Sequence, residues 1–258
     1  TQYIPLLPVF RRCFPEPPDD IYTPIDKSSP RTVKYHQARP NEGRERGRSR
    51  NLQRLPPFAA HLCGAMKKEH LKYLACPCCK GDLCIIDVQK QSDVSVETGV
   101  LGCLKCDAKY DIIRHIPRFV PLEKYAIGFG LEWTIHSRTQ YDSYTGSNVS
   151  EQRFFEETRW HRRLQGEIIL EVGSGSGRFT EQAASTGAMV ISLDYSYAVD
   201  ANYASNGTKN NVLIVQADVY RMPFREGLFD KIFCIGVLQY TPDPAAAFAV
   251  LPRYLKSG

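Results

Sequence analysis

The stretch from Ile168 to Thr180 most constrains what this 258-residue chain can fold into. It opens with the apolar run Ile168–Val172 and continues as Gly173-Ser174-Gly175-Ser176-Gly177. An apolar run without polar alternation is typical of a parallel strand that is covered on both faces. Glycines permit positive φ and a close approach to the backbone, and the N–H groups that begin a helix attract anionic groups. The stretch therefore predicts a strand, a turn and a helix that hold a nucleoside cofactor.

Further strands and helices alternate after this turn. We predict strands at 168–172, 189–194, 212–215 and 231–237, and helices at 178–185, 198–204 and 245–251. Asp243-Pro244 supplies an N-cap and a proline at the first position of the last helix. Alternating strands and helices indicate an α/β fold with a parallel sheet and right-handed crossovers.

Asp194 follows the glycine turn by about twenty residues, at the tip of the second strand. A carboxylate there can accept hydrogen bonds from both ribose hydroxyls, which suits NAD and S-adenosylmethionine (SAM) equally well. The turn reads G-x-G-x-G, so it differs from the G-x-G-x-x-G pattern of dinucleotide sites. It also lacks the Gly-Lys-Ser/Thr of a P-loop, which argues against ATP hydrolysis.

Three further features separate the two cofactors. Glu171 leads into the turn, Asp218–Phe224 has the form Asp-x-x-x-x-Pro-Phe, and Thr241-Pro-Asp-Pro follows the fourth strand. With these motifs, residues 166–258 resemble the class I SAM-dependent methyltransferases. The resemblance implies a Rossmann-like sheet whose complete strand order is 3-2-1-4-5-7-6. Leu255-Lys-Ser-Gly is similar to the segment that precedes strand five in that family, so we expect a domain truncated after its fourth strand, and unstable or inactive alone.

The same resemblance implies roles for individual residues. Glu171 would orient the amino group of SAM, and Asp194 would hold the ribose. Asp218 would accept a hydrogen bond from the adenine amino group, with Val219 beside the ring. The remaining implied cofactor contacts are Gly173, Gly175, Gly177, Gly236 and Val237. Gln239-Tyr240 stands where many relatives carry histidine, so the catalytic residues are left unknown.

Cysteines form the second informative pattern. Six of the nine lie between Cys76 and Cys106, a clustering that favours metal binding in a reducing cytoplasm over disulfides. Cys76, Cys79, Cys103 and Cys106 form two C-x-x-C pairs, which suit a tetrahedral, structural Zn²⁺ with Zn–S bonds of about 2.3 Å. Cys78 could replace either neighbour, and we expect Cys84 to be a spare thiol. Alternating apolar positions between the pairs predict a hairpin.

Residues 68–121 resemble the zinc-ribbon proteins that partner and activate tRNA and protein methyltransferases. The resemblance depends on Leu74–Leu83, on Cys103–Ile112 and on the closing Ile116-Pro-Arg-Phe. The order of a ribbon followed by a methyltransferase is also similar to that of zinc-containing rRNA guanine methyltransferases, which use a different ligand set. We expect a small β-rich zinc ribbon at 66–121.

The start of the chain has a different composition. Residues 1–65 hold ten of the 17 prolines and 11 Lys+Arg against 6 Asp+Glu, whereas the remainder carries 22 of each. This composition predicts that 1–65 is a disordered tail. Because Met66 resembles a natural start, we also hypothesise that the tail is non-native. A basic arm that contacts RNA is the alternative. Residues 122–165 are predicted to be a linker or lid, with a helix near Phe154 that carries Trp160 on one face. A role in contacting the substrate or the cofactor is equally open.

The sequence thus predicts methyl transfer from SAM within residues 166–258. The acceptor is unidentified; we favour a small molecule over RNA or protein, because the remainder of the chain is electrically neutral. One alternative is a non-catalytic zinc-ribbon and Rossmann module that binds RNA or a protein partner. An NAD-linked oxidoreductase is disfavoured by Glu171 and by Asp218–Phe224. No apolar run reaches membrane-spanning length, so we expect no membrane partner and a cytoplasmic location.

Overall fold

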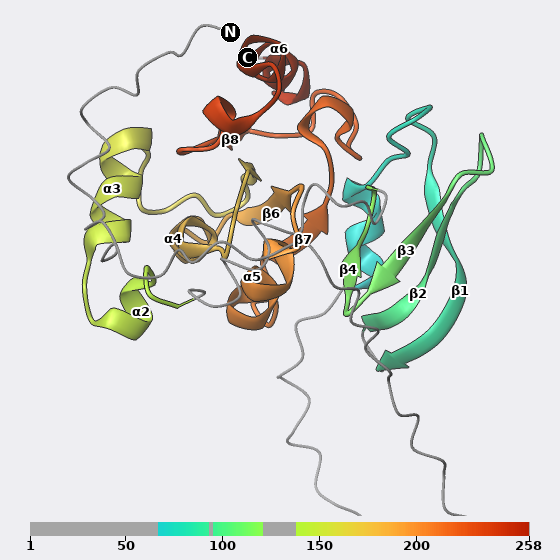
Figure 1. The fold of residues 1–258 in the computed structure, drawn as a ribbon, viewed down its shortest axis with the longest axis horizontal. Helices are drawn as coiled ribbons and strands as arrows, with labels where there is room; N and C mark the ends of the chain where they lie inside the picture. The colour runs from blue at the N-terminus through green and yellow to red at the C-terminus, as the bar shows by residue number, and fades with distance from the viewer. Residues whose placement is uncertain (1–66, 93–94, 121–137, 258) are drawn as a thin grey trace, which may run out of the picture. The chain divides into compact units, whose positions relative to one another are not determined.

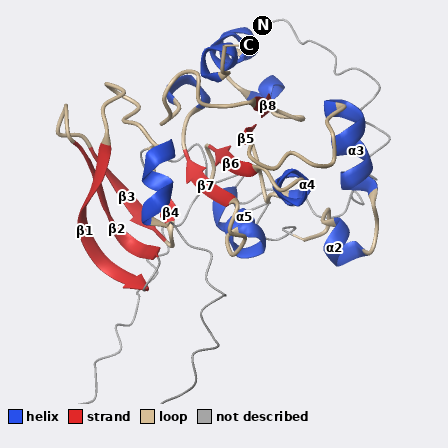
Figure 2. Ribbon diagram, turned by 180° about the vertical axis from the view of Figure 1, so that it is seen from behind, coloured by secondary structure: helices blue, strands red, loops and turns tan. Residues whose placement is uncertain are grey.

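A computed structural model describes residues 67–92, 95–120 and 138–257. The predicted tail and much of the predicted linker, including Phe129–Trp133, lie outside these ranges. The described residues contain two four-stranded sheets, which Figure 2 shows as two separate groups of strands. None of the described helices combines the length and apolar character that crossing a bilayer requires.

The first sheet is antiparallel and lies in residues 67–120, which we call the ribbon. Its strands follow chain order. The ribbon comprises the 3₁₀ helix η2 (Lys68–Tyr73) and the strands β1 (Leu83–Ser92), β2 (Ser95–Cys103), β3 (Lys109–Ile113) and β4 (Ile116–Pro117). Strands β1 and β2 form the hairpin that the spacing between the two cysteine pairs predicts, because Leu83 pairs with Cys103 at its open end.

The second sheet is parallel and lies in residues 138–257, which we call the parallel-sheet region. Its strand order is β7-β6-β5-β8, which is the order 3-2-1-4 that the sequence predicts for the first four strands. Its strands are β5 (Ile168–Val172), β6 (Met189–Asp194), β7 (Val212–Gln216) and β8 (Lys231–Phe233). Its helices are α2 (Asp142–Thr145), α3 (Val149–Thr158), α4 (Arg178–Ser185), α5 (Ala198–Asn206), η4 (Val219–Arg221), η5 (Leu238–Tyr240), α6 (Pro244–Val250) and η6 (Leu251–Tyr254).

Several boundaries differ from the sequence prediction, most by one or two residues. Strand β8 ends at Phe233 rather than Val237, since Gly236 has a φ of 74° that no strand residue adopts. Helix α3 starts at Val149 and ends before Arg159, whose φ is 55°. Trp160 therefore lies beyond the helix. Its ring packs edge-on against the ring of Phe233, with 5.9 Å between the ring centroids. The N-cap prediction is confirmed, because the Asp243 side chain accepts a hydrogen bond from Ala246 N.

Alternate residues of the parallel strands enter two different cores. Ile169 of β5 and Val190 of β6 pack in one cluster with Phe179 of α4, Val199 of α5 and Phe154 of α3. The next residues along the strands, which include Leu170, Ile191, Leu213 and Val215, pack in a second cluster with α6, η6 and the ribbon. The second cluster includes the ribbon residues Leu74, Leu83, Val96 and Leu101. Both faces of the parallel sheet are thus covered, and the ribbon forms part of one cover (Figure 1).

The end of the ribbon also lies against β7. Arg118 forms a parallel bridge with Gln216, and Phe119 N donates to Gln216 O over 2.8 Å. The Arg118 guanidinium, 6% exposed, donates to the Gln216 side chain at 2.9 Å and to Asp200 of α5 at 2.8 Å. The closing Ile-Pro-Arg-Phe segment of the ribbon therefore extends the edge of the parallel sheet.

Candidate functional site

The glycine turn between β5 and α4 adopts backbone conformations that glycine takes most easily. The φ angle is 78° at Gly173 and 96° at Gly177. Gly173 N donates to Leu193 O over 2.7 Å, which ties the turn to the end of β6. A Cβ at Gly173 would lie 2.3 Å from Cγ1 of Val237, and one at Gly177 would lie 2.1 Å from Oδ1 of Asn202. The backbone conformation therefore favours glycine at both positions. The atoms that a Cβ would meet there belong to the protein, to Val237 and Asn202.

Glu171 is buried at the end of β5, with 2% of its surface exposed. Its Oε2 accepts hydrogen bonds from Ser192 Oγ at 2.8 Å and from Thr180 Oγ1. The Asn202 amide donates to both of these hydroxyls, at 2.9 and 3.0 Å. Burial raises the pKa of the Glu171 carboxyl to about 7, and the charge of Asp194 acts in the same direction. The site therefore holds a carboxyl group that is poised to ionise near neutral pH.

Asp194 ends β6, and its carboxylate faces the glycine turn. Oδ2 accepts from Gly175 N at 2.8 Å, while Oδ1 accepts from the N and Oγ of Ser196, at 2.8 and 2.7 Å. Each carboxylate oxygen has more than one acceptor position, so these bonds leave capacity for ligand hydroxyls. The structure thus brings together two residues that the sequence assigned to cofactor binding, Gly175 and Asp194.

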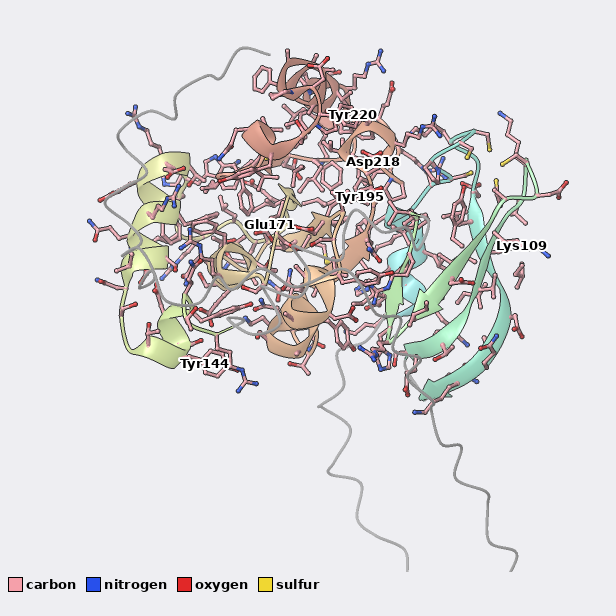
Figure 3. All side chains as sticks on the ribbon, in the orientation of Figure 1. Lys109, Tyr144, Glu171, Tyr195, Asp218 and Tyr220 are labelled. Carbon is pink, nitrogen blue, oxygen red and sulfur yellow. The ribbon has the colours of Figure 1, made fainter. Side chains whose placement is uncertain are left out.

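Asp218 lies beyond the end of β7, the neighbour of β6. Asp194 pairs with Gln216 in the register of the two strands, and Asp218 follows two residues later. Its side chain accepts from Tyr220 N at 2.9 Å and so caps η4, and Val219 is 9% exposed. Figure 3 shows Glu171, Tyr195 and Asp218, which come from three adjacent strands or their ends. The carboxyl ends of parallel strands are where open α/β sheets bind ligands.

The last two predicted cofactor residues follow β8. At Gly236, φ is 74° and a Cβ would meet nothing within 4 Å. Val237 packs against Gly173, so the end of β8 reaches the glycine turn. The predicted residues therefore approach one another around the ends of β5, β6 and β8, with Asp218 on the next strand along.

Two features of this site were missed from the sequence. Tyr141, 1% exposed, donates its hydroxyl to Ser176 O of the glycine turn and accepts from Asn206 Nδ2 at 2.9 Å. Asn202 and Asn206 are fully buried on α5 and bond to each other at 2.9 Å. Asparagines four residues apart on a helix otherwise rich in alanine could have signalled this network, whereas no local pattern marks Tyr141.

The four cysteines of the two C-x-x-C pairs converge in the ribbon. Their sulfur atoms all lie within 4.8 Å of one another. Cys76 Sγ is 3.6 Å from Cys106 Sγ, and Cys79 Sγ is 3.5 Å from Cys103 Sγ. A tetrahedral Zn²⁺ with sulfur ligands requires S–S separations of about 3.8 Å, so the four thiols fit this ion.

The two other ribbon cysteines lie outside this group. Cys78 is exposed, and its Sγ is 3.6 Å from the hydroxyl of Tyr110. Cys84 lies on β1, where its Sγ is 3.6 Å from Gly102 O. Of the alternatives that the sequence left open, the geometry favours Cys76 and Cys79 over Cys78 in the first pair.

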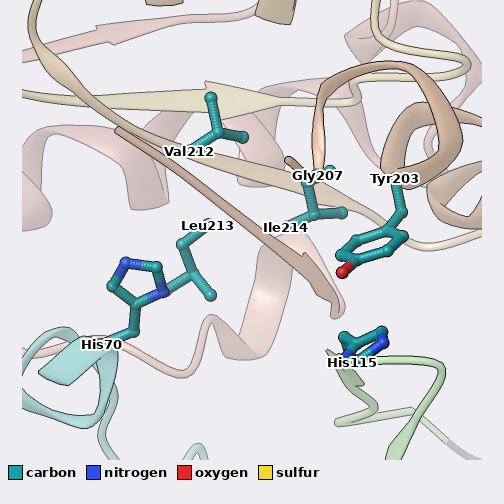
Figure 4. Close-up of a pocket in the computed structure, with 7 residues that line it drawn as sticks. All are labelled: His70, His115, Tyr203, Gly207, Val212, Leu213 and Ile214. Carbon is teal, nitrogen blue, oxygen red and sulfur yellow. The ribbon is translucent and has the colours of Figure 1, made fainter. Parts of the chain in front are cut away.

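A cavity of about 10 Å³ lies between the ribbon and the parallel sheet (Figure 4). It is lined by His70, His115, Tyr203, Gly207, Val212, Leu213 and Ile214. The His115 and Tyr203 rings stack across it at 5.3 Å. The volume is that of about one water molecule, so the cavity is too small for a nucleoside.

The C-terminal segment of the chain matches a known family. Residues 170–258 match the methyltransferase domain family. An uncharacterized chloroplastic methyltransferase of Arabidopsis thaliana is 31% identical over 119 residues, which cover 42% of this chain and 33% of that protein. A ubiquinone biosynthesis O-methyltransferase of Thiobacillus denitrificans is 31% identical over 99 residues, 37% of this chain and 42% of its own. Residues 170–258 are thus similar to methyltransferase domains.

The chain spans less than half the length of each of these curated relatives. Among solved structures, this chain is similar to phosphoethanolamine N-methyltransferase 1 of Haemonchus contortus, solved with phosphoethanolamine and S-adenosylhomocysteine. That match has 20% identity and a TM-score of 0.40, and it covers 50% of this chain and 30% of the other. A complex of the Haloferax volcanii Trm112 methyltransferase activator with a protein assigned as a methyltransferase also matches. Its identity is 20% and its TM-score 0.39, over 50% of this chain and 56% of that one.

Proposed function

We propose that this protein transfers a methyl group from SAM to a small-molecule acceptor. The observation that carries the proposal is the meeting of Gly175 with Asp194 at the ends of β5 and β6, beside the buried Glu171. SAM carries ammonium and sulfonium charges and ribose hydroxyls, and two carboxyl groups beside the glycine turn supply negative charge and hydrogen-bond acceptors that fit them. SAM supplies the methyl group, and displacement from a sulfonium depends mainly on positioning.

In this proposal each predicted residue has a defined task. Glu171 orients the amino group of SAM, and the three glycines of the turn accommodate its methionine portion. Asp194 accepts the ribose hydroxyls, while Asp218 and Val219 hold the adenine. Gly236 and Val237 line the cleft near the sulfonium, where Gly236 leaves open space.

Titration with SAM and with NADH tests this function. We expect SAM binding that Asp194→Asn weakens by at least tenfold, which corresponds to loss of about 1.4 kcal/mol for one charged hydrogen-bonding group. NADH should not bind. Absence of SAM binding by the zinc-loaded wild-type protein would leave the non-catalytic binding module as the surviving alternative, and NADH binding would favour the oxidoreductase.

The proposal for the acceptor depends on two observations. The curated relatives include a ubiquinone biosynthesis O-methyltransferase and a demethylmenaquinone methyltransferase of Thermobifida fusca, the latter 30% identical over 96 residues, which cover 36% of this chain and 41% of its own. Residues 66–258 are also electrically neutral, which offers no general attraction for RNA. Transfer assays with phenolic small molecules and with bulk RNA distinguish these acceptors; labelled RNA would contradict the proposal.

We further propose that Cys76, Cys79, Cys103 and Cys106 hold one structural Zn²⁺. Four thiolates leave no open coordination position, so the ion would stabilise the ribbon without taking part in the reaction. Free thiols and thiolate ligands persist in a reducing compartment, which supports our proposal of a cytoplasmic location. Fluorescent tagging of the natural protein tests this location, and an exclusively organellar signal would contradict it.

A further inference from the structure

The turn that contains the first cysteine pair is shaped by its own backbone. Cys76 N donates to Gly81 O at 2.9 Å, and Lys80 N donates to Cys76 O at 2.8 Å. Lys80 has a φ of 58°, a left-handed conformation that is uncommon for residues other than glycine. The residue directly after Cys79 is therefore held in a conformation that depends on how the two cysteines are placed.

The Lys80 side chain crosses from the ribbon to the parallel-sheet region. Its Nζ donates to Met222 O at 2.7 Å and to the hydroxyl of Tyr254 at 2.9 Å. Both partners are buried, since Met222 is 0% and Tyr254 4% exposed. The same ammonium lies 5.2 Å from the centre of the Tyr254 ring, within the range of a cation–π contact. The Met222 carbonyl and the hydroxyl and ring of Tyr254 thus stabilise the positive charge of Lys80.

Two neighbouring contacts hold the same segment. Ala75 N donates to Pro223 O at 2.8 Å, and Asp82 forms an ion pair with Arg225. Residues on both sides of the cysteine pair therefore contact the stretch from Met222 to Arg225. That stretch begins four residues after Asp218, whose side chain caps η4.

We propose that Lys80 is a positioning residue for the cofactor site: by holding the Met222 carbonyl, it couples the metal-binding turn to the Asp218–Phe224 loop. The inference rests on the proposed role of Asp218 and Val219 in binding adenine. A metal ion in the four-cysteine site would stabilise the turn from Cys76 to Gly81. That turn orients the Lys80 side chain, and the hydrogen bond from Lys80 to Met222 O stabilises the Asp218–Phe224 loop. Binding at the two sites is then linked, and such linkage is reciprocal: SAM makes zinc harder to remove, and zinc makes SAM bind more tightly.

Zinc competition with a chelator, with and without saturating SAM, tests the linkage in the zinc-loaded chain. We compare the wild type with Lys80→Met, which removes the donor, and with Lys109→Met as a matched control. Lys109 is an exposed lysine of β3 in the same ribbon (Figure 3). We expect SAM to tighten zinc retention on the order of tenfold in the wild type and in Lys109→Met, and by less than about twofold in Lys80→Met. Lys80→Gln, too short to reach both acceptors, replaces Lys80→Met if the latter does not fold.

Equal coupling in Lys80→Met and the wild type overturns the inference, as does a wild type that binds SAM without any effect on zinc. Hydrogen exchange of the 218–225 amides, measured without SAM, distinguishes a failure of the Lys80 inference from a failure of the proposed function. Faster exchange confined to that segment in Lys80→Met supports the positioning role even if the wild type binds no SAM. Unchanged exchange overturns it.

Discussion

Glu171 is the side chain whose protonation the fold controls most directly at the proposed cofactor site. Its carboxyl is buried under the glycine turn and bonded to two hydroxyls, which are themselves held by the Asn202 amide. Those hydrogen bonds favour the charged form, but burial outweighs them and raises the pKa to about 7. Between pH 4.5 and 7 the Glu171 carboxyl is therefore protonated in the folded chain but ionised in the unfolded chain. Its contribution to stability is present at low pH and is lost as the pH rises through 7.

A cationic ligand group beside Glu171 should release that proton. At pH 7 we expect about half a proton to leave per SAM bound, because the carboxyl is about half protonated beforehand. Calorimetric titration in phosphate and in Tris measures the release as a difference in apparent enthalpy. Glu171→Gln should abolish the difference, and Glu181→Gln on α4 should keep it. Equal heats in both buffers for the wild type would contradict this role for Glu171.

His70 presents the opposite case on the ribbon side of the small cavity. It is 3% exposed, its Nδ1 has no protein partner, and burial lowers its pKa to about 4, with Glu69 opposing and Lys67 and Lys72 adding to the shift. Between pH 6.5 and 4 the unfolded chain binds a proton that the folded chain does not, so stability falls as the pH falls.

His70→Leu should remove this pH dependence. From pH 7 to pH 4.5 the variant should gain about 2 kcal/mol of unfolding free energy relative to the wild type, as follows from the two pKa values. Urea denaturation at both pH values measures the gain. The exposed His161→Leu is the control and should follow the wild type. A pH-independent difference between His70→Leu and the wild type would show that the histidine does not titrate in this way.

At the level of elements, the glycine turn offers a comparison between strain and crowding. Gly177 and Gly166 have similar φ values, 96° and 88°, but a Cβ at Gly166 meets nothing within 4 Å. We expect Gly166→Ala to cost about 1 kcal/mol, since it adds only the unfavourable backbone conformation. Gly177→Ala should cost roughly 3 kcal/mol or more, because it also displaces the buried Asn202 amide. Chemical denaturation measures both values, and equal costs would refute the role assigned to crowding.

Much of the parallel sheet could be predicted from the sequence because its signals are local. A few adjacent residues are enough to predict the strand at Ile168–Val172, the glycine turn and the Asp243-Pro244 cap. The early end of β8 could not be predicted, because the presence of Gly236 in the sequence permits a positive φ but does not show that the residue adopts one. Tyr141 and Lys80 bond to partners 35 and 142 residues away in the chain, and no local pattern encodes such distances.

At the scale of the molecule, the ribbon and the parallel sheet share one apolar cluster. The sequence predicted them as separate units, because the ribbon's alternating residues are those of any small hairpin. In the structure Leu74, Val96 and Leu101 are 0 to 1% exposed and belong to the same cluster as Leu170 and Leu213. Loss of the ribbon's fold would therefore expose part of one face of the parallel sheet, and the stability of the two should be linked.

Metal removal should consequently destabilise the whole chain in one transition. We expect elemental analysis to find one zinc ion per chain in the wild type and none in Cys106→Ser. Cys84→Ser and Cys78→Ser, in the same ribbon but outside the four-cysteine cluster, should retain the ion. If zinc contributes roughly 3 kcal/mol, the melting temperature of Cys106→Ser should fall by about 6 to 12 °C for a folded unit of this size. Calorimetry should record this as a shift of one peak, with near-ultraviolet and far-ultraviolet dichroism changing together. Two separate peaks, or an unchanged main peak after zinc loss, would show that the ribbon unfolds alone and that the shared cluster does not couple it to the parallel-sheet region.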